Sequence, residues 1–196
     1  MSILFFDTET TGLPNYGLPT NHEDQPHVVQ LAAIITDERG EEQAQLSVII
    51  KPDGWIIPEG ATRVHGITTE KASRYGIREV VAAGAMYDLC CAAETIVAHN
   101  IKFDRQIVGT MFARAGRGWK LPERQVCTMM NASPIVNLPP TERMIAAGYG
   151  DKPKVPSLAE CIRHFYGEEL DGAHDALVDV RACKRIYFEM LEQVPA

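Results

Sequence analysis

Two carboxylates, Asp7 and Glu9, end the apolar run "ILFF" at residues 3–6. β-forming residues without polar alternation predict a central strand that is covered on both faces. Because successive strand side chains point to opposite faces, Asp7 and Glu9 are expected on the same face, one pleat apart. Two buried anions so close together are costly unless a positive charge compensates them. This stretch therefore predicts a cation site.

The residues after this pair favour ligand binding over the alternative, a solvated strand end. "TTGL" at residues 10–13 combines small hydroxyl side chains with a glycine, and a turn of this kind exposes backbone N–H groups beside the carboxylates. Backbone N–H groups in a turn bind anionic ligands. A cation and an anionic ligand are therefore expected at one place.

Asp104, in "AHNIKFD" at residues 98–104, is the next candidate. The simpler explanation is an acid in the first turn of a helix, where it interacts with the helix dipole. However, Asp104 lies one helical turn beyond the end of an apolar strand. That is the place where α/β sheets carry their sites.

His174 and Asp179, in "GAHDALVD" at residues 172–179, complete the set. The alternative explanation is a loop histidine and an exposed helix acid. Asp175 is expected to cap the last helix at its N-terminus. Asp179 lies one turn further along, next to the apolar stripe of that helix.

The elements that position these residues can be read from periodicity and turn signals. Strands are expected at residues 3–6, on either side of a turn at 37–42, at 94–99 and at 124–129. Helices are expected at residues 66–76, 77–91, 101–116, 142–147, 157–167 and about 175–192. Ser157 and Glu160 form a capping-box pattern, whereas residues 131–156 are rich in proline and glycine and are the least regular part. Strands first, then strands alternating with helices, indicate an α/β protein with a mixed sheet and helices on its faces.

Length and composition limit the function. We expect one domain over residues 1–196. No apolar run is long enough for a membrane span, and nothing before the first strand marks the chain for export, so no membrane association and a cytoplasmic location are expected. The five cysteines show neither zinc-site nor disulfide spacing. The net charge of −7 argues against a nucleic-acid partner, but less so if four carboxylates bind metal.

Taken together, D-x-E on the first strand, "HNxxFD" before a mid-chain helix and H-x-x-x-x-D at the last helix resemble the DEDD superfamily of 3′-to-5′ exonucleases. More narrowly, they resemble its histidine branch, the DnaQ-like or DEDDh enzymes. "VVQLAAI" and "VHGIT" agree with this, and the resemblance runs from residue 3 to about residue 190. In the tyrosine branch a tyrosine would stand at position 175, where this chain has aspartate.

The resemblance implies an RNase H-like fold, with a five-stranded mixed sheet flanked by helices on both faces. It implies two divalent ions, Mg²⁺ or Mn²⁺, which prefer oxygen ligands. Asp7, Glu9 and Asp179 would bind the first ion, and Asp7 with Asp104 the second. Two ions about 3.5 to 4 Å apart stabilise the attacking and leaving oxygens of an in-line displacement. His174 would be the general base, and the product a nucleoside 5′-monophosphate.

The resemblance also implies contacts to a single-stranded 3′ end. Backbone groups of Thr10, Thr11 and Gly12 would contact the terminal nucleotide, and Leu13 would wedge against its base. His65 and Phe103 would line the pocket, and Asn100 would position the site; simple core packing is the alternative for Phe103.

Three functions stay open at this point. DNA is favoured as the substrate, because the family's oligoribonucleases usually have methionine where Thr8 stands between the two acids. The first alternative is a 3′-to-5′ exoribonuclease that trims RNA ends or short oligoribonucleotides. The second is a non-catalytic module that binds nucleic-acid ends. A homodimer is possible, and a polymerase-tethering tail is not expected, because the chain ends almost where its last helix does.

Overall fold

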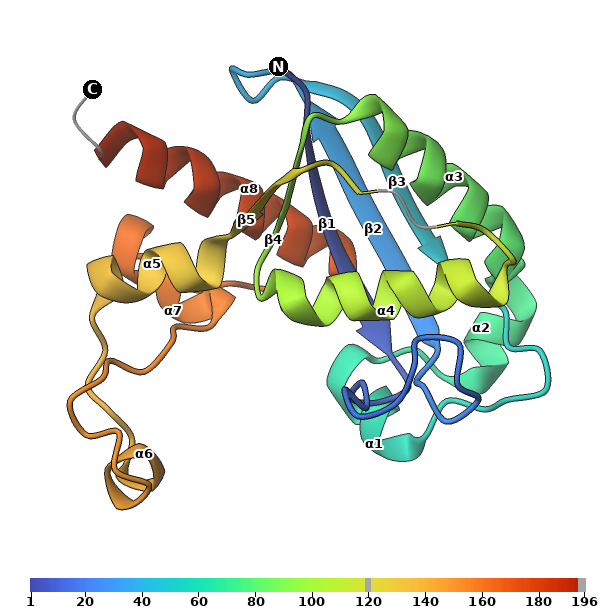
Figure 1. Cartoon of the computed structure of the whole chain (residues 1–196), viewed down its shortest axis with the longest axis horizontal. Helices are drawn as coiled ribbons and strands as arrows, with labels where there is room; N and C mark the ends of the chain where they lie inside the picture. The colour runs from blue at the N-terminus through green and yellow to red at the C-terminus, as the bar shows by residue number, and fades with distance from the viewer. Residues whose placement is uncertain (119–120, 194–196) are drawn as a thin grey trace.

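The computed structural model describes residues 1–118 and 121–193, and its centre is a five-stranded mixed sheet in the order β3-β2-β1-β4-β5 (Figure 1). β1 pairs antiparallel with β2 and parallel with β4, while β2–β3 is antiparallel and β4–β5 is parallel. The strands are β1 (Ile3–Thr10), β2 (Val28–Thr36), β3 (Glu42–Ile49), β4 (Thr95–Ala98) and β5 (Arg124–Cys127). The predicted mixed α/β sheet with helices on its faces is confirmed.

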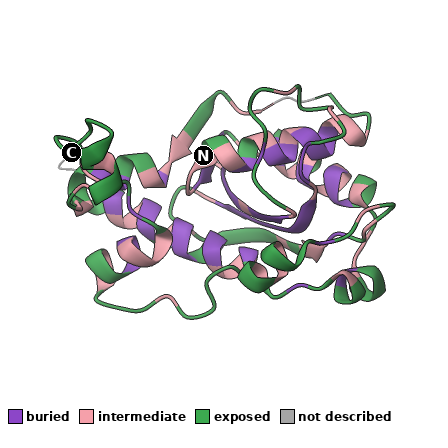
Figure 2. Cartoon of the chain, turned by 90° about the horizontal axis from the view of Figure 1, so that it is seen from below, coloured by how far each residue is buried: buried purple, intermediate pink, exposed green. Residues whose placement is uncertain are grey.

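Helices cover both faces of the sheet. α3 (Glu79–Ala92) and α4 (Ile101–Arg114) lie on one face, and α8 (Ala176–Gln193) lies on the other (Figure 1). Figure 2 shows the buried centre of the sheet between these layers. No helix in the described part of the chain is long and apolar enough to cross a bilayer.

Alternation along β1 divides its side chains between the two layers. Leu4 and Phe6 pack in the cluster that contains residues of α3 and α4, whereas Ile3 and Phe5 pack in the cluster of α8 residues. All four are at most 1% exposed, as expected for a strand covered on both faces. The next odd-numbered positions, 7 and 9, therefore face the side of α8.

Five shorter helices surround this core. α1 (Glu59–His65) and α2 (Thr69–Tyr75) lie near the C-terminal end of β1, and α5 (Thr128–Val136) and α7 (Leu158–Tyr166) lie near β5 (Figure 1). α6 (Glu142–Ala146) stands away from the rest of the molecule in Figure 1, within the segment expected to be irregular. The capping box of α7 is present, since Ser157 Oγ accepts from the Glu160 N–H and the Glu160 side chain accepts from the Ser157 N–H.

Two helices were not expected from the sequence. α5 contains Pro134, which lacks the N–H for a helical hydrogen bond and therefore gives a loop signal. The helix ends soon after the proline: Val136 is its last residue, and Asn137 follows in the left-handed conformation (φ 47°). α1 is short and has no buried residue, so it carries no apolar periodicity.

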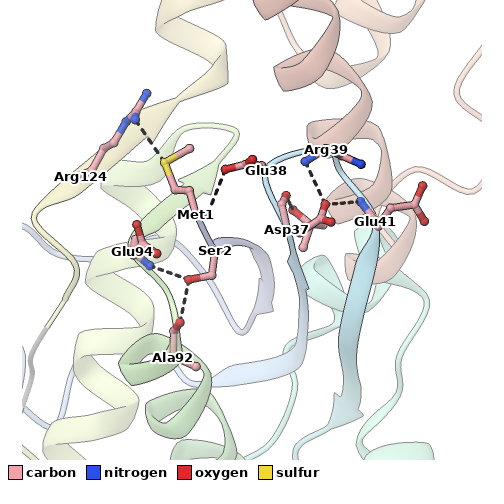
Figure 3. Close-up of polar contacts among 10 residues, drawn as sticks. Met1, Ser2, Asp37, Glu38, Arg39, Glu41, Ala92, Glu94 and Arg124 are labelled. Carbon is pink, nitrogen blue, oxygen red and sulfur yellow. Dashed lines mark hydrogen bonds and ion pairs between the residues drawn. The ribbon is translucent and has the colours of Figure 1, made fainter.

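The end of the sheet opposite the C-terminus of β1 is closed by short polar contacts (Figure 3). Ser2 Oγ donates to the Ala92 carbonyl (2.8 Å) and accepts from the Glu94 N–H (3.2 Å), which ties β1 to the start of β4. Asp37 accepts from the N–H groups of Arg39 and Glu41 and so shapes the β2–β3 turn. No predicted site residue lies at this end.

Candidate active site

A cavity of about 420 Å³ opens at the C-terminal end of β1. Its walls come from β1 and the loop after it, from α1, from the start of α4 and from the start of α8. The lining residues are Asp7, Thr8, Glu9, Thr10, Thr11, Gly12, Leu13, Gly60, Ala61, Val64, His65, His99, Phe103, Asp104, His174 and Asp179. All five predicted catalytic residues therefore line one cavity.

Asp7 and Glu9 reach the cavity from the face of β1 that packs against α8, as the strand alternation predicts. Both lie at the register where β1 pairs with β2, opposite Ala32 and Gln30. Glu9 is only 9% exposed. The strand therefore holds two carboxylates at a fixed separation, close to the buried core.

Asp104 is buried (2% exposed) rather than solvated in the first turn of α4. Its Oδ1 accepts two hydrogen bonds from Thr8, one from the hydroxyl (2.8 Å) and one from the backbone N–H (3.1 Å). Thr8 points to the α4 side of β1, so these bonds hold α4 against the strand that carries the D-x-E pair. Asp104 does lie in the first turn of the helix, as the simpler explanation has it, but it is buried and bonded to β1.

The start of α8 is fixed to β2 by Gln30. The Ala176 N–H donates to Gln30 Oε1 (3.2 Å), and Gln30 Nε2 donates to Asp175 Oδ2 (3.4 Å). Asp175 Oδ1 in turn accepts from the Leu177 N–H (3.0 Å), which confirms Asp175 as the N-terminal cap. One turn further on, Asp179 is 7% exposed and lines the cavity. The cap and Gln30 thus set the position of Asp179.

His174 lies on the loop before α8 and is exposed. Its backbone is in the left-handed region (φ 68°), and its N–H donates to Asp179 Oδ2 (3.1 Å). One ligand atom each of Glu9, His174 and Asp179 lie within 4.8 Å of one another. The imidazole is therefore next to the carboxylates but open to solvent, and it can meet an incoming ligand.

The carboxyl groups are largely buried and repel one another. Burial, followed by the charges of Asp104, Asp179 and Glu9, raises the pKa of Asp7 well above its usual value. Burial, followed by the charge of Asp179, raises the pKa of Glu9 to about 8. Burial also raises the pKa of Asp104 to about 7, although the Thr8 hydrogen bonds act in the opposite direction. No basic side chain forms an ion pair with these four acids among the described residues.

These residues fit divalent metal ions. Asp179 Oδ1 is buried and has no hydrogen-bond partner among the described residues, which is costly unless a ligand satisfies it. The donors are carboxylate oxygens, the ligands that Mg²⁺ and Mn²⁺ prefer. A cation would also remove the repulsion that raises the carboxyl pKa values.

The predicted substrate residues lie at the rim and the wall of the cavity, with one exception. Leu13 is 85% exposed, as a side chain that meets a base would be, and Phe103 both lines the cavity and packs on the core. His65 Nδ1 accepts from the Ile67 N–H (3.1 Å), which leaves the ring proton on Nε2. Asn100 does not line the cavity; it turns the chain into α4 in the left-handed conformation (φ 70°). Its assignment stays a prediction.

The loop after β1 differs from the expectation in one respect. The Thr11 N–H donates to the His27 carbonyl (3.0 Å), and the Gly12 N–H donates to Thr10 Oγ1 (3.3 Å). These two N–H groups are already paired and so are not free for an anion.

His99 is a cavity residue that the sequence reasoning missed. One ring nitrogen lies 3.0 Å from Thr128 Oγ1 and the other 3.0 Å from the Pro156 carbonyl. Burial lowers its pKa to about 4, so the ring is neutral at pH 7. "AHN" directly after an apolar strand carries the signal, but the contact to Pro156 cannot be read from local sequence.

Comparisons with known proteins agree with this geometry. A family model described as exonuclease (RNase_T) matches residues 4–187. Among solved structures, E. coli exonuclease I with a dT13 oligonucleotide gives a TM-score of 0.75 at 23% identity over 98% of this chain and 41% of that chain. A zinc-bound complex of the same E. coli protein with single-stranded DNA gives a TM-score of 0.72 at 23% identity, over 97% of this chain and 40% of that chain. No curated protein sequence matches.

The fold and the family model together define a nuclease with an RNase H-like fold. The chain belongs to the exonuclease family and, within it, to the DnaQ-like (DEDDh) group that the motifs indicated. It spans about 40% of the length of the exonuclease I chains that it resembles.

Proposed function

We propose that the chain is a metal-dependent 3′-to-5′ exonuclease that releases nucleoside 5′-monophosphates from single-stranded or frayed DNA ends. The observation that carries this proposal is the convergence of four carboxylates from β1, α4 and α8 on one cavity. Their raised pKa values mark a site that favours a bound cation.

Asp7, Glu9 and Asp179 would hold one Mg²⁺ or Mn²⁺, and Asp7 with Asp104 a second. When bound, the ions stabilise negative charge on the attacking and leaving oxygens of the phosphodiester. Asp179 also holds the His174 loop through the backbone N–H of His174.

His174 would take the proton from the attacking water. Histidine changes its charge near neutral pH, which suits this task. Its exposure supports the role, because the base must reach a water molecule that arrives with the substrate. It stays close to Glu9 and Asp179 while doing so.

The terminal nucleotide would lie against Leu13, Phe103 and His65. Stacking on such side chains tolerates any base, so little sequence preference is expected. DNA is favoured over RNA, since exonuclease I of E. coli was solved with single-stranded DNA and Thr8 differs from the methionine usual in oligoribonucleases. The homodimer stays a prediction, which light scattering can check.

The test is a time course on 5′-labelled single-stranded DNA and on RNA of the same sequence, in Mg²⁺, in Mn²⁺ and in EDTA. Removal from the 3′ end gives a ladder of labelled products, whereas removal from the 5′ end releases labelled mononucleotide at once. Asp7→Asn and Asp179→Asn should abolish the ladder without unfolding the chain, and Asp88→Asn, an exposed acid on α3, should not. A ladder on RNA alone would overturn the DNA assignment, and no shortening of either strand would favour the binding module.

A further inference from the structure

A second cavity, of about 530 Å³, lies beside the start of α3 and the end of α4. Its other walls come from the segment after β3 and from the residue before β2. The lining residues are His27, Lys51, Pro52, Asp53, Trp55, Arg78, Glu79, Val80, Arg114 and Ala115. None of them lines the first cavity, and no role predicted from the sequence involves them.

One wall of this second cavity is aromatic. The rings of His27 and Trp55 stack with their centroids 4.4 Å apart and their planes at 10°. Burial and the nearby Arg114 lower the pKa of His27 to about 4, so the stack is uncharged at pH 7. Flat uncharged rings at the wall of a cavity are a surface on which a nucleobase can pack.

The other wall carries free positive charge. Arg114 is committed to the fold, since it donates to the carbonyls of Pro26 (3.0 Å) and Gln25 (2.5 Å) and lies 3.9 Å from Glu79. Lys51 and Arg78 are exposed, and neither forms an ion pair among the described residues.

Two acids line this cavity as well. The charge of Glu79 is compensated by Arg114. The remaining charged side chains of the lining are therefore one acid, Asp53, and two bases, Lys51 and Arg78. α3 also begins here, at Arg78, without a side-chain cap. A 14-residue helix presents its positive dipole end at this point, in a chain whose net charge is −7.

A hydrogen-bonded pair of residues links the two cavities. Thr11, which lines the first cavity, donates its N–H to the His27 carbonyl (3.0 Å), and Thr11 Oγ1 accepts from the His27 N–H (2.9 Å). His27 lines the second cavity. The Thr11–His27 pair therefore joins a residue of the first cavity directly to a residue of the second.

We propose that the second cavity is a nucleotide-binding site for an upstream part of the substrate strand, with a base on the His27–Trp55 wall and a phosphate at Lys51 and Arg78. This inference rests on the proposed exonuclease function. The same chemistry would also accept a free nucleoside monophosphate, and the experiment separates the two ligands.

The main variant is Lys51→Glu/Arg78→Glu, compared with Arg39→Glu/Arg124→Glu. The control makes the same change in net charge at the opposite end of the sheet (Figure 3). For a 20-nucleotide single strand, the first variant should raise KM about tenfold with kcat unchanged. It should also reduce the slope of log KM against log salt by about 0.7, as expected for the loss of one phosphate contact to a single strand. Hydrolysis of thymidine 5′-monophosphate 4-nitrophenyl ester, which fills the first cavity alone, should not change.

Equal KM values in the two double variants would overturn the proposal. If the unaltered protein hydrolyses neither substrate, the proposed function has failed; anisotropy of labelled single strands in EDTA then tests the second cavity by itself. The free-nucleotide reading is tested by titrating thymidine monophosphate into a Trp119→Phe protein, in which Trp55 is the one remaining tryptophan. Two results together would overturn the proposal and assign the cavity to free nucleotides. Thymidine monophosphate would quench the Trp55 fluorescence only while Lys51 and Arg78 are present, and Lys51→Glu/Arg78→Glu would leave the KM for the strand unchanged.

Discussion

Thr8 donates two hydrogen bonds to one oxygen of Asp104, from its hydroxyl group at 2.8 Å and from its backbone N–H at 3.1 Å. The residue between the two acids of the D-x-E pair thus holds the carboxylate that comes from α4. The bonds lower the pKa of Asp104 against the effect of burial, and so favour its ionised, metal-binding form.

Thr8→Val should weaken metal binding, because it removes the hydroxyl donor and keeps the shape of the side chain. A hydrogen bond to a charged group contributes about 1.5 to 3 kcal/mol, so the Mg²⁺ concentration for half-maximal activity should rise about tenfold or more. Thr8→Ser keeps the hydroxyl donor, so its Mg²⁺ concentration for half-maximal activity should stay near that of the unaltered protein. A Mg²⁺ titration of nuclease activity measures both. Identical half-saturation in Thr8→Val would show that the hydroxyl does not support Asp104.

The metal-free protein should lose stability as pH rises from 7 to 8.5. Burial and its acidic neighbours raise the pKa of Glu9 to about 8, above the value near 4.5 expected in the unfolded chain. Between these two values the folded state holds more protons than the unfolded state, so the free energy of unfolding falls with rising pH. Glu9 alone accounts for about 1 kcal/mol of this loss, and Asp104 acts in the same direction. Urea unfolding in EDTA at both pH values measures it.

The control for this pH dependence is Glu9→Gln, which should reduce it, compared with the exposed Glu192→Gln, which should not. Above pH 7, His27 and His99 are neutral in the folded state and largely neutral in the unfolded state, where histidine has a pKa near 6.5. In Mg²⁺ the dependence should shrink, since bound metal favours the ionised carboxylates. A stability in EDTA that rises between pH 7 and 8.5 would contradict the origin assigned to the raised pKa values.

Local sequence predicts the parts of the site that depend on one element. Alternation along β1 places Asp7 and Glu9 on one face, and the position of Asp175 predicts the start of α8. The partner of Asp104 could not be predicted, because Thr8 is 96 residues away and points to the other face of β1. Motif resemblance brought the four acids together where local periodicity could not.

In the fold, too, local sequence predicts single elements but not the contacts between distant segments. The meander of β1, β2 and β3 and the long helices follow from apolar periodicity. α5 was not predicted, because proline is a helix-breaking signal and Pro134 lies inside this helix, which ends two residues later, at Val136. The place of residues 137–156 depends in part on a long-range contact, that of the Pro156 carbonyl with His99, 57 residues away.

His99→Ala should lower stability more than it changes the chemistry. The neutral ring bridges Thr128 and the Pro156 carbonyl. Its removal leaves the buried Pro156 carbonyl without this partner, whereas Thr128 Oγ1 keeps its contacts to the Ala98 carbonyl and Cys183 Sγ. Each unsatisfied group costs about 1 to 3 kcal/mol, and urea unfolding should show a loss in this range. The pH profile of hydrolysis should keep its shape, because the pKa of His99 lies near 4, far below the working range. A shifted profile would make His99 a participant in proton transfer.

His174→Asn is the sharpest test of the general base. His174 has a φ of 68°, and asparagine adopts this left-handed conformation more readily than alanine, so the loop and its N–H bond to Asp179 should be kept. Loss of a general base lowers the rate by about 10²- to 10⁴-fold, while binding of Mn²⁺, measured by calorimetry, should remain. His174→Ala adds backbone strain, so a larger loss in this variant than in His174→Asn would measure the contribution of the loop. If His174→Asn loses Mn²⁺ binding together with activity, the imidazole acts as a metal ligand beside Glu9 and Asp179, with which it already lies within 4.8 Å.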